Sequence, residues 1–122
     1  MKARITREVI QRIRDIGGPV ARAASEILEY YNSASQEDGL RKGGALHDPL
    51  AVACLIDRSL VKTRRMYVDV ETKSELTRGE TVGDIRGLTG REPNVDVCLD
   101  ADGERFFDLL IDRLQRAYGV ES

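Results

Sequence analysis

The chain has 122 residues and a formal net charge of −2, with 41% apolar and 33% charged residues and both signs of charge interspersed. This composition is typical of a globular protein the size of one ordinary domain and excludes a disordered or fibrous chain. The near balance of charge removes the simplest electrostatic reason to bind nucleic acid or an anionic membrane, so we expect neither partner.

Three features of the sequence predict a cytoplasmic protein. The first ten residues, MKARITREVI, carry charges every two or three positions and lack the apolar core of a signal peptide. The longest apolar run, LAVACLI at 50–56, is far shorter than the roughly 20 residues of a membrane-spanning helix. Cys54 and Cys98 lie far apart between apolar neighbours without metal-binding spacing, which predicts buried free thiols.

The N-terminal part of the chain is predicted to be helical. Thr6 can cap a helix that ends at Gly17-Gly18, and Pro19 suits the first turn of a second helix. Apolar residues recur on one face of this second helix at positions 20, 23, 24, 27, 28 and 31. Residues 32–44, NSASQEDGLRKGG, are polar and rich in Ser and Gly, and we expect an exposed, mobile loop there.

The periodicity changes after residue 60. RRMYVDVET at 64–72 alternates apolar and polar residues as a half-buried strand does, and GETVGDIRG at 79–87 and NVDVCLD at 94–100 are further strand candidates. We expect these three to pair as one small sheet. A closing helix is predicted over about 102–118, and no internal boundary divides residues 1–122, which form a single domain or a fragment of α/β class.

The chain's one histidine, His47, directly precedes Asp48 and Pro49, and this tripeptide has two interpretations. Asp before Pro commonly opens a helix, because the carboxylate accepts the free backbone N–H groups of the first turn. Alternatively, a carboxylate and an imidazole on adjacent residues place a metal ligand beside a proton donor. The dipeptide alone leaves both open.

Three longer stretches carry a resemblance to a known family. GGALHDPLAVACLIDRSL at 43–60, MYVDVETKSELTRGETVGDIRG at 66–87 and REPNVDVCLDADGERFFDLLIDRL at 91–114 resemble the C-terminal portion of the inosine-uridine type nucleoside hydrolases. The resemblance implies part of an open α/β fold, with helices and a small group of short strands. One departure, Gly83-Asp84-Ile85 where relatives more often have Val-Asp-Arg, is expected to affect only a strand.

The resemblance also implies a function. Members of this family cleave the N-glycosidic bond of ribonucleosides to ribose and free base, using a bound calcium ion. Asp48 matches the family's C-terminal calcium ligand, and His47 matches the neighbour proposed to protonate the leaving base. Tyr30 or Tyr31 is a candidate for contact with the base, although helical spacing alone explains Tyr31 as a core residue.

The remaining calcium ligands of the family lie in an N-terminal motif of the form DxDxGxDD, which this sequence does not contain. One carboxylate cannot supply the six to eight oxygen ligands of calcium, so the chain alone is expected to bind the ion weakly and to be inactive. The alternative hypothesis is a non-catalytic α/β module that self-associates as a homo-oligomer. The sequence does not predict a preference for purine or pyrimidine nucleosides.

Overall fold

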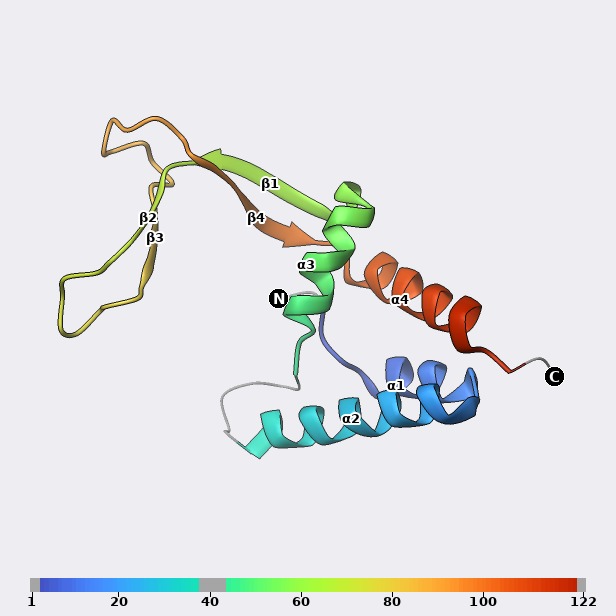
Figure 1. Ribbon diagram of the computed structural model, residues 1–122. Helices are drawn as coiled ribbons and strands as arrows, with labels where there is room; N and C mark the ends of the chain where they lie inside the picture. The colour runs from blue at the N-terminus through green and yellow to red at the C-terminus, as the bar shows by residue number, and fades with distance from the viewer. Residues whose placement is uncertain (1–2, 38–43, 121–122) are drawn as a thin grey trace. The chain divides into compact units, whose positions relative to one another are not determined.

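The computed structural model describes residues 3–37 and 44–120, and its chain order is three helices, a short 3-10 turn, four strands and a final helix (Figure 1). The elements are α1 (Arg7–Asp15), α2 (Gly18–Glu37), α3 (His47–Ile56), η1 (Arg58–Leu60), β1 (Val61–Met66), β2 (Val68–Val70), β3 (Thr81–Gly83), β4 (Val95–Ala101) and α4 (Gly103–Tyr118). Residue contacts divide the chain into unit 1, Met1–Val61 with Asp100–Ser122, and unit 2, Lys62–Leu99. The expected single domain stays a prediction, since a cluster of contacts is not by itself an independently folding domain.

The core of unit 1 forms where the apolar stripes of α1 and α4 meet, as their sequence spacing predicts. The Thr6 hydroxyl caps α1 by accepting from the backbone N–H of Val9 at 3.2 Å, and Asp102 caps α4 by accepting from the N–H of Arg105 at 3.1 Å. Tyr118, at the end of the predicted closing helix, is exposed. The buried cluster consists of Ala3, Val9, Ile13, Ala53, Leu60, Phe106, Phe107 and Ile111.

Helix α2 buries a face that coincides only in part with the one that the sequence predicts. Ala21 and Ser25 are buried, and the Ser25 hydroxyl donates to the carbonyl of Arg22 at 2.8 Å. Ile27 and Tyr31, which belong to the predicted apolar face, are exposed. Positions 21, 24, 25 and 28 have the same helical spacing as the predicted stripe, and Ala24 and Leu28 belong to both. The small side chains of Ala21 and Ser25 allow a neighbouring helix to pack closely.

The same helix is also longer than predicted. It runs to Glu37, so the loop expected at 32–44 is wrong for residues 32–37, and residues 38–43 lie outside the described residues. The polar composition of residues 32–37 suggested a loop. These residues contain no Gly or Pro, however, so nothing in them ends the helix. The Ser33 hydroxyl donates to the carbonyl of Tyr30 at 2.8 Å, a bond that helices accommodate.

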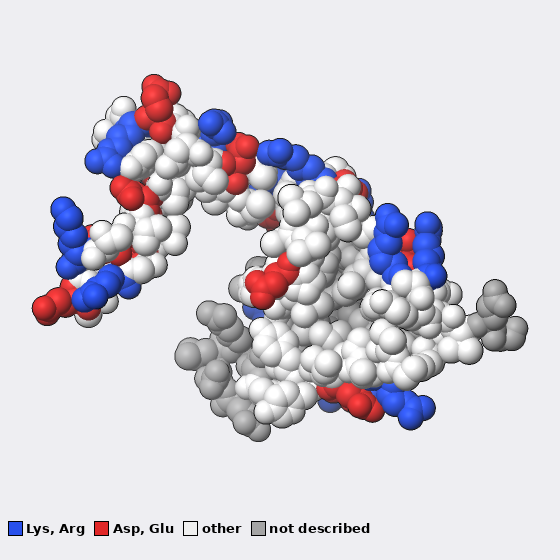
Figure 2. Space-filling view, viewed as in Figure 1, with Lys and Arg blue, Asp and Glu red and all other residues white. Residues whose placement is uncertain are grey.

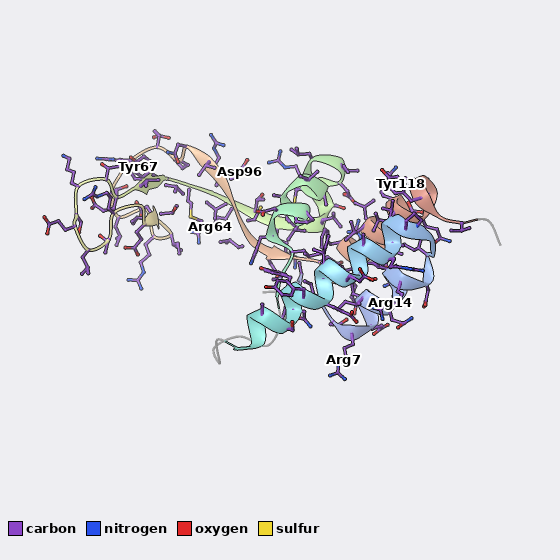
Figure 3. All side chains as sticks on the ribbon, turned by 60° about the horizontal axis from the view of Figure 1, so that its bottom comes forward. Arg7, Arg14, Arg64, Tyr67, Asp96 and Tyr118 are labelled. Atoms are coloured by element: carbon purple, nitrogen blue, oxygen red, sulfur yellow. The ribbon has the colours of Figure 1, made fainter. Side chains whose placement is uncertain are left out.

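The strands form two separate pairs in place of the predicted three-stranded sheet. β1 pairs with β4, and β2 pairs antiparallel with β3, with Val68 opposite Gly83. The predicted strand at 64–72 is divided at Tyr67, which lies between the end of β1 and the start of β2 (Figure 3). There the side chain of Asn94 accepts from the N–H of Val68 and donates to its carbonyl, both at 2.9 Å, and so replaces a strand partner.

A polar cluster around Tyr67 connects Asp69 with Arg91 in unit 2. Its hydroxyl donates to Asp69 at 2.9 Å, and the guanidinium of Arg91 lies 5.0 Å from the ring centroid and 3.2 Å from Asp69. The Tyr67 hydroxyl is the main cause of the lowered pKa of Asp69. Met66 is the one buried apolar side chain among residues 62–99 that the structure describes, so unit 2 has little apolar core of its own.

The two cysteines differ from their predicted burial. Both are free thiols, as expected, but Cys54 is half-buried and Cys98 is exposed. Cys98 lies in β4, which has one strand neighbour, β1. A two-stranded ribbon leaves side chains open to solvent, and for this reason the burial predicted for Cys98 from its apolar neighbours is wrong.

Asp84 organises the turn that follows β3, and its pKa predicts an acid-sensitive turn. The hydroxyl and N–H of Thr89 donate to its carboxylate at 2.6 and 2.8 Å, and the N–H of Leu88 donates at 2.8 Å. These bonds hold the pKa of Asp84 below its ordinary value of 3.8. A carboxylate with a lowered folded-state pKa stabilises the fold above its ordinary value, and the effect is lost as the pH falls through the folded-state pKa.

We therefore expect the backbone amides of Leu88 and Thr89 to lose protection against hydrogen exchange as the solution is acidified. The measurement is the protection factor of each amide by NMR, from neutral pH downward. In Asp84→Asn, the amide side chain does not titrate, and protection should be lower and independent of pH. Equal protection of both amides in strong acid and at neutral pH would show that the carboxylate does not hold this turn.

Candidate functional site

The backbone leading into α3 is fixed by a short strand-like contact. Residues 3–5 lie antiparallel to residues 44–46, with the N–H of Ile5 donating to Gly44 at 2.9 Å and that of Leu46 to Ala3 at 3.0 Å. The N–H of Gly44 also donates to the Asn32 side chain at 3.1 Å. These bonds tie the start of α3 both to the N-terminal segment and to α2.

Asn32 is a positioning residue that the sequence did not reveal, because it fell in the predicted loop. In the structure it lies directly after Tyr31 on α2, and its amide oxygen holds the backbone three residues before His47. An asparagine followed by polar residues gives no signal of such a contact. Only the path of the chain between α2 and α3 brings the two together.

His47 and Asp48 begin α3 together, but the predicted helix cap is wrong. The N-cap residue is Leu46, whose side chain cannot accept a hydrogen bond. Asp48 lies inside the first turn, with Pro49 after it. A carboxylate there is still favoured by the helix dipole. Both His47 and Asp48 are exposed, and neither side chain has a hydrogen-bond or ion-pair partner among the described residues.

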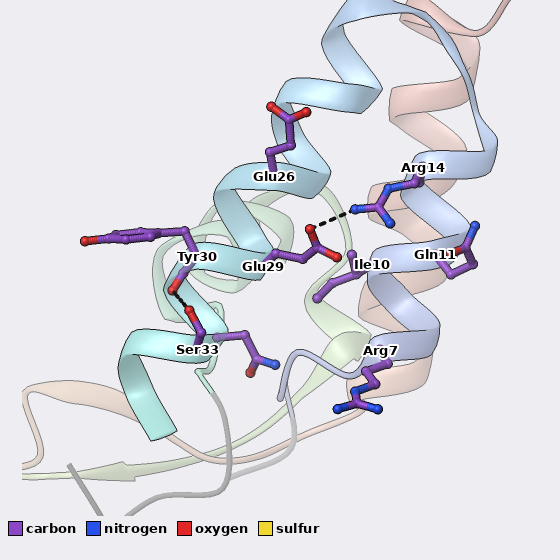
Figure 4. Close-up of a pocket in the computed structure, with 9 residues that line it drawn as sticks. Arg7, Ile10, Gln11, Arg14, Glu26, Glu29, Tyr30 and Ser33 are labelled. Carbon is purple, nitrogen blue, oxygen red and sulfur yellow. Dashed lines mark hydrogen bonds and ion pairs between the residues drawn. The ribbon is translucent and has the colours of Figure 1, made fainter. Parts of the chain in front are cut away.

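The two tyrosine candidates lie on a different helix, and both are exposed. Tyr30 is at the edge of an open groove of about 650 Å³ between α1 and α2, and its ring points away from α1 (Figure 4). An ion pair of 2.9 Å between Arg14 and Glu29 crosses this groove. Neither His47 nor Asp48 lines it, so the groove does not unite the predicted site residues. Tyr31 is not the core residue that helical spacing suggested.

The described residues do not by themselves fit a calcium ion. Calcium takes six to eight oxygen ligands, usually including several carboxylates. Asp48 offers an exposed carboxylate at the start of α3, but within residues 3–37 and 44–120 no three His, Cys, Asp or Glu side chains are grouped closely enough to hold a metal. Asp48 can therefore be at most one ligand of a site completed by other groups.

Structural comparison defines the class of protein. The chain is similar to the solved structure of a purine-preferring ribonucleoside hydrolase from Gardnerella vaginalis, with a TM-score of 0.77 and 27% sequence identity. The match covers 93% of this chain and 36% of the other. The fold is therefore a part of the α/β fold found in a ribonucleoside hydrolase. No helix among the described residues is both long enough and apolar enough to span a bilayer.

Sequence comparison then gives the family. Residues 1–108 match the model of the inosine-uridine preferring nucleoside hydrolases, and the chain belongs to this family. It is 40% identical over 115 residues to the pyrimidine-specific ribonucleoside hydrolase RihA of Salmonella paratyphi C, and 40% identical over 114 residues to that of Klebsiella pneumoniae strain 342. The match covers 93% of this chain but only 37% of these relatives. The resemblance to the C-terminal portion of the family is confirmed, as is the mixed α/β class.

Proposed function

We propose that this chain forms the leaving-base side of a calcium-dependent ribonucleoside hydrolase site, and that it is inactive without the remaining part of that site. The observation that carries the proposal is the placement of His47 and Asp48, adjacent, exposed and without partners among the described residues, at the first turn of α3 in a chain of this family. An imidazole and a carboxylate in that state are available to substrate and metal.

The role of His47 follows from the chemistry of the glycosidic bond. When the bond between the ribose carbon and the base nitrogen breaks, both bonding electrons leave with the base, and the ribose carbon gains positive charge. Water adds its oxygen to that carbon and gives up a proton to a general base outside this chain, and the base nitrogen must gain a proton to leave as a neutral molecule. A protonated imidazole beside the base supplies that proton as a general acid.

The role of Asp48 is to be one oxygen ligand of the calcium ion. The ion, when bound, orients the attacking water and the ribose hydroxyls, and its other ligands come from outside the described residues. The adjacency of Asp48 and His47 in one helical turn would place the metal ligand and the proton donor on neighbouring residues.

A variant of His47 tests the proposed proton transfer. In a hybrid enzyme that joins the N-terminal part of the Salmonella relative to this chain, we expect His47→Gln to lower kcat for inosine or uridine by roughly 10²–10⁴-fold, the usual contribution of a general acid. The readout is release of reducing sugar.

The matched control is a change of substrate. Nitrophenyl riboside releases a stable anion that needs no proton, so its hydrolysis by the same variant should fall far less. Equal losses on both substrates would contradict a role in protonating the base and would indicate a general loss of site structure.

A further inference from the structure

The start of α3 is held from outside the helix. Its N-cap residue is Leu46, so the usual side-chain oxygen that fixes where a helix begins is replaced by a hydrocarbon. The segment that enters the helix is anchored instead, because Gly44 and Ala45 are buried while His47 is exposed. The orientation of His47 therefore depends on what holds residues 44–46.

Gly44 is hydrogen-bonded through both its carbonyl and its N–H. The carbonyl accepts from the N–H of Ile5 at 2.9 Å, which is a bond between backbone atoms. The N–H donates to the side-chain oxygen of Asn32 at 3.1 Å, which is a bond to helix α2. In a buried residue such as Gly44, an N–H without an acceptor is costly, so the Asn32 oxygen supplies an acceptor that this segment needs.

The bond from Gly44 to Asn32 joins the two helices that carry the predicted site residues. Asn32 directly follows Tyr30 and Tyr31 on α2, and Gly44 lies three residues before His47 on α3. Both helices belong to unit 1, which Figure 2 shows with few charged side chains over α2, α3 and α4. The bonds of residues 44–46 to residues 3–5 join backbone atoms, so they do not depend on which side chains are present. Asn32 is the point at which a side chain controls this segment.

We propose that Asn32 is a positioning residue for protonation of the leaving base, because its side-chain oxygen fixes residues 44–46 and thereby holds His47 in place relative to α2. This inference rests on the proposed function. In this role Asn32 acts through His47 and needs no contact with the substrate. Proton transfer requires the donor to lie within hydrogen-bond reach of its acceptor, so a small displacement of His47 lowers the rate steeply.

The first test uses the 122-residue chain and needs no substrate. Asn32→Leu has a side chain of similar size that cannot accept a hydrogen bond, whereas Asn32→Asp keeps an acceptor oxygen. Amide hydrogen exchange by NMR should show the protection of Gly44 lowered at least about tenfold in Asn32→Leu and kept in Asn32→Asp. The matched control, Ser33→Ala, removes a hydroxyl that bonds within α2 to the carbonyl of Tyr30, and it should leave Gly44 protected. Equal protection of Gly44 in the parent and in Asn32→Leu would overturn the proposal.

The second test uses the hybrid enzyme and compares two substrates. Asn32→Leu should lower kcat for inosine or uridine at least about tenfold and kcat for nitrophenyl riboside far less, because only the natural base needs a proton from His47. Asn32→Asp should restore the rate on the natural substrate. In the His47→Gln background, Asn32→Leu should cause little further loss, since the two residues act on the same step.

The two substrates also separate this inference from the proposed function. A selective loss on the natural substrate in Asn32→Leu, absent in the His47→Gln background and rescued by Asn32→Asp, supports the proposal. If His47→Gln distinguishes the two substrates and Asn32→Leu lowers both rates equally, the positioning role is overturned and the proposed function stands. If neither variant distinguishes the substrates, both are overturned.

Discussion

Asp48→Ala is expected to reduce calcium-supported nucleoside hydrolysis by the hybrid enzyme at least about a hundredfold. Loss even of a residue that only supports a metal ligand costs roughly 10–100-fold, and loss of the ligand itself should cost no less. The carboxylate has no structural partner among the described residues, so its removal should not disturb α3. Reducing-sugar release at saturating calcium and in a calcium titration measures the effect.

The control for this prediction is Asp108→Ala, which removes the same charge from α4. Asp108 pairs with Arg12 at 2.7 Å, but both side chains are well exposed, and such pairs contribute little. The control enzyme should keep the activity and calcium response of the parent. If Asp48→Ala kept them too, Asp48 would not be a ligand and the proposed site would be wrong.

Phe106→Ala is expected to lower the free energy of unfolding by about 3–5 kcal/mol, the usual cost of removing a buried aromatic side chain. Phe106 is 1% exposed, and its ring centroid lies 4.9 Å from that of Phe107, so its loss opens a cavity where α1 and α4 meet. A domain of this size has a total stability of about 5–15 kcal/mol, so the variant should be close to unfolding. Urea denaturation followed by circular dichroism measures the change.

Leu55→Ala is the matched control, because it truncates a large apolar residue that is exposed in the chain alone. Its effect should stay within about 0.5 kcal/mol. If Phe106→Ala and Leu55→Ala had equal effects, the division of unit 1 into a buried core and an exposed side of α3 would be wrong.

The sequence predicted α1 and α4 well because each carries one apolar stripe and a side chain that caps it. Thr6 and Asp102 accept the backbone N–H groups that the predicted starts require. Helix α2 was harder, because two stripes with the same spacing overlap on it. Helical spacing alone allows either Ile27 or Ser25 to be buried. Ser25 is the buried residue, because its small side chain allows α1 to pack closely.

The arrangement of the strands depends on contacts that are distant in sequence. Alternation predicted one strand across Tyr67, but the side chain of Asn94 takes over the hydrogen bonds of Val68 and separates β1 from β2. Nothing in the alternating pattern at 64–72 indicates a partner 26 positions further along the chain. The number of strands and their pairing were therefore beyond local sequence patterns.

Only the part of the candidate site that depends on neighbouring residues in the sequence was predictable. That His47 and Asp48 share the first turn of a helix follows from adjacent positions before a proline and an apolar run. That Leu46 and not Asp48 occupies the N-cap follows from the pairing of residues 44–46 with residues 3–5, which fixes where the helix begins. The capping hypothesis failed for this reason, and Asp48 is left free of a structural role among the described residues.

The central claim is that Asp48 contributes one ligand to a calcium site that this chain does not complete alone. Isothermal titration calorimetry with calcium tests it most directly, on the 122-residue chain and on the hybrid enzyme in parallel. We predict no saturable one-site binding by the chain, and one site in the hybrid that Asp48→Ala removes. Tight one-site binding by the chain alone would contradict the claim.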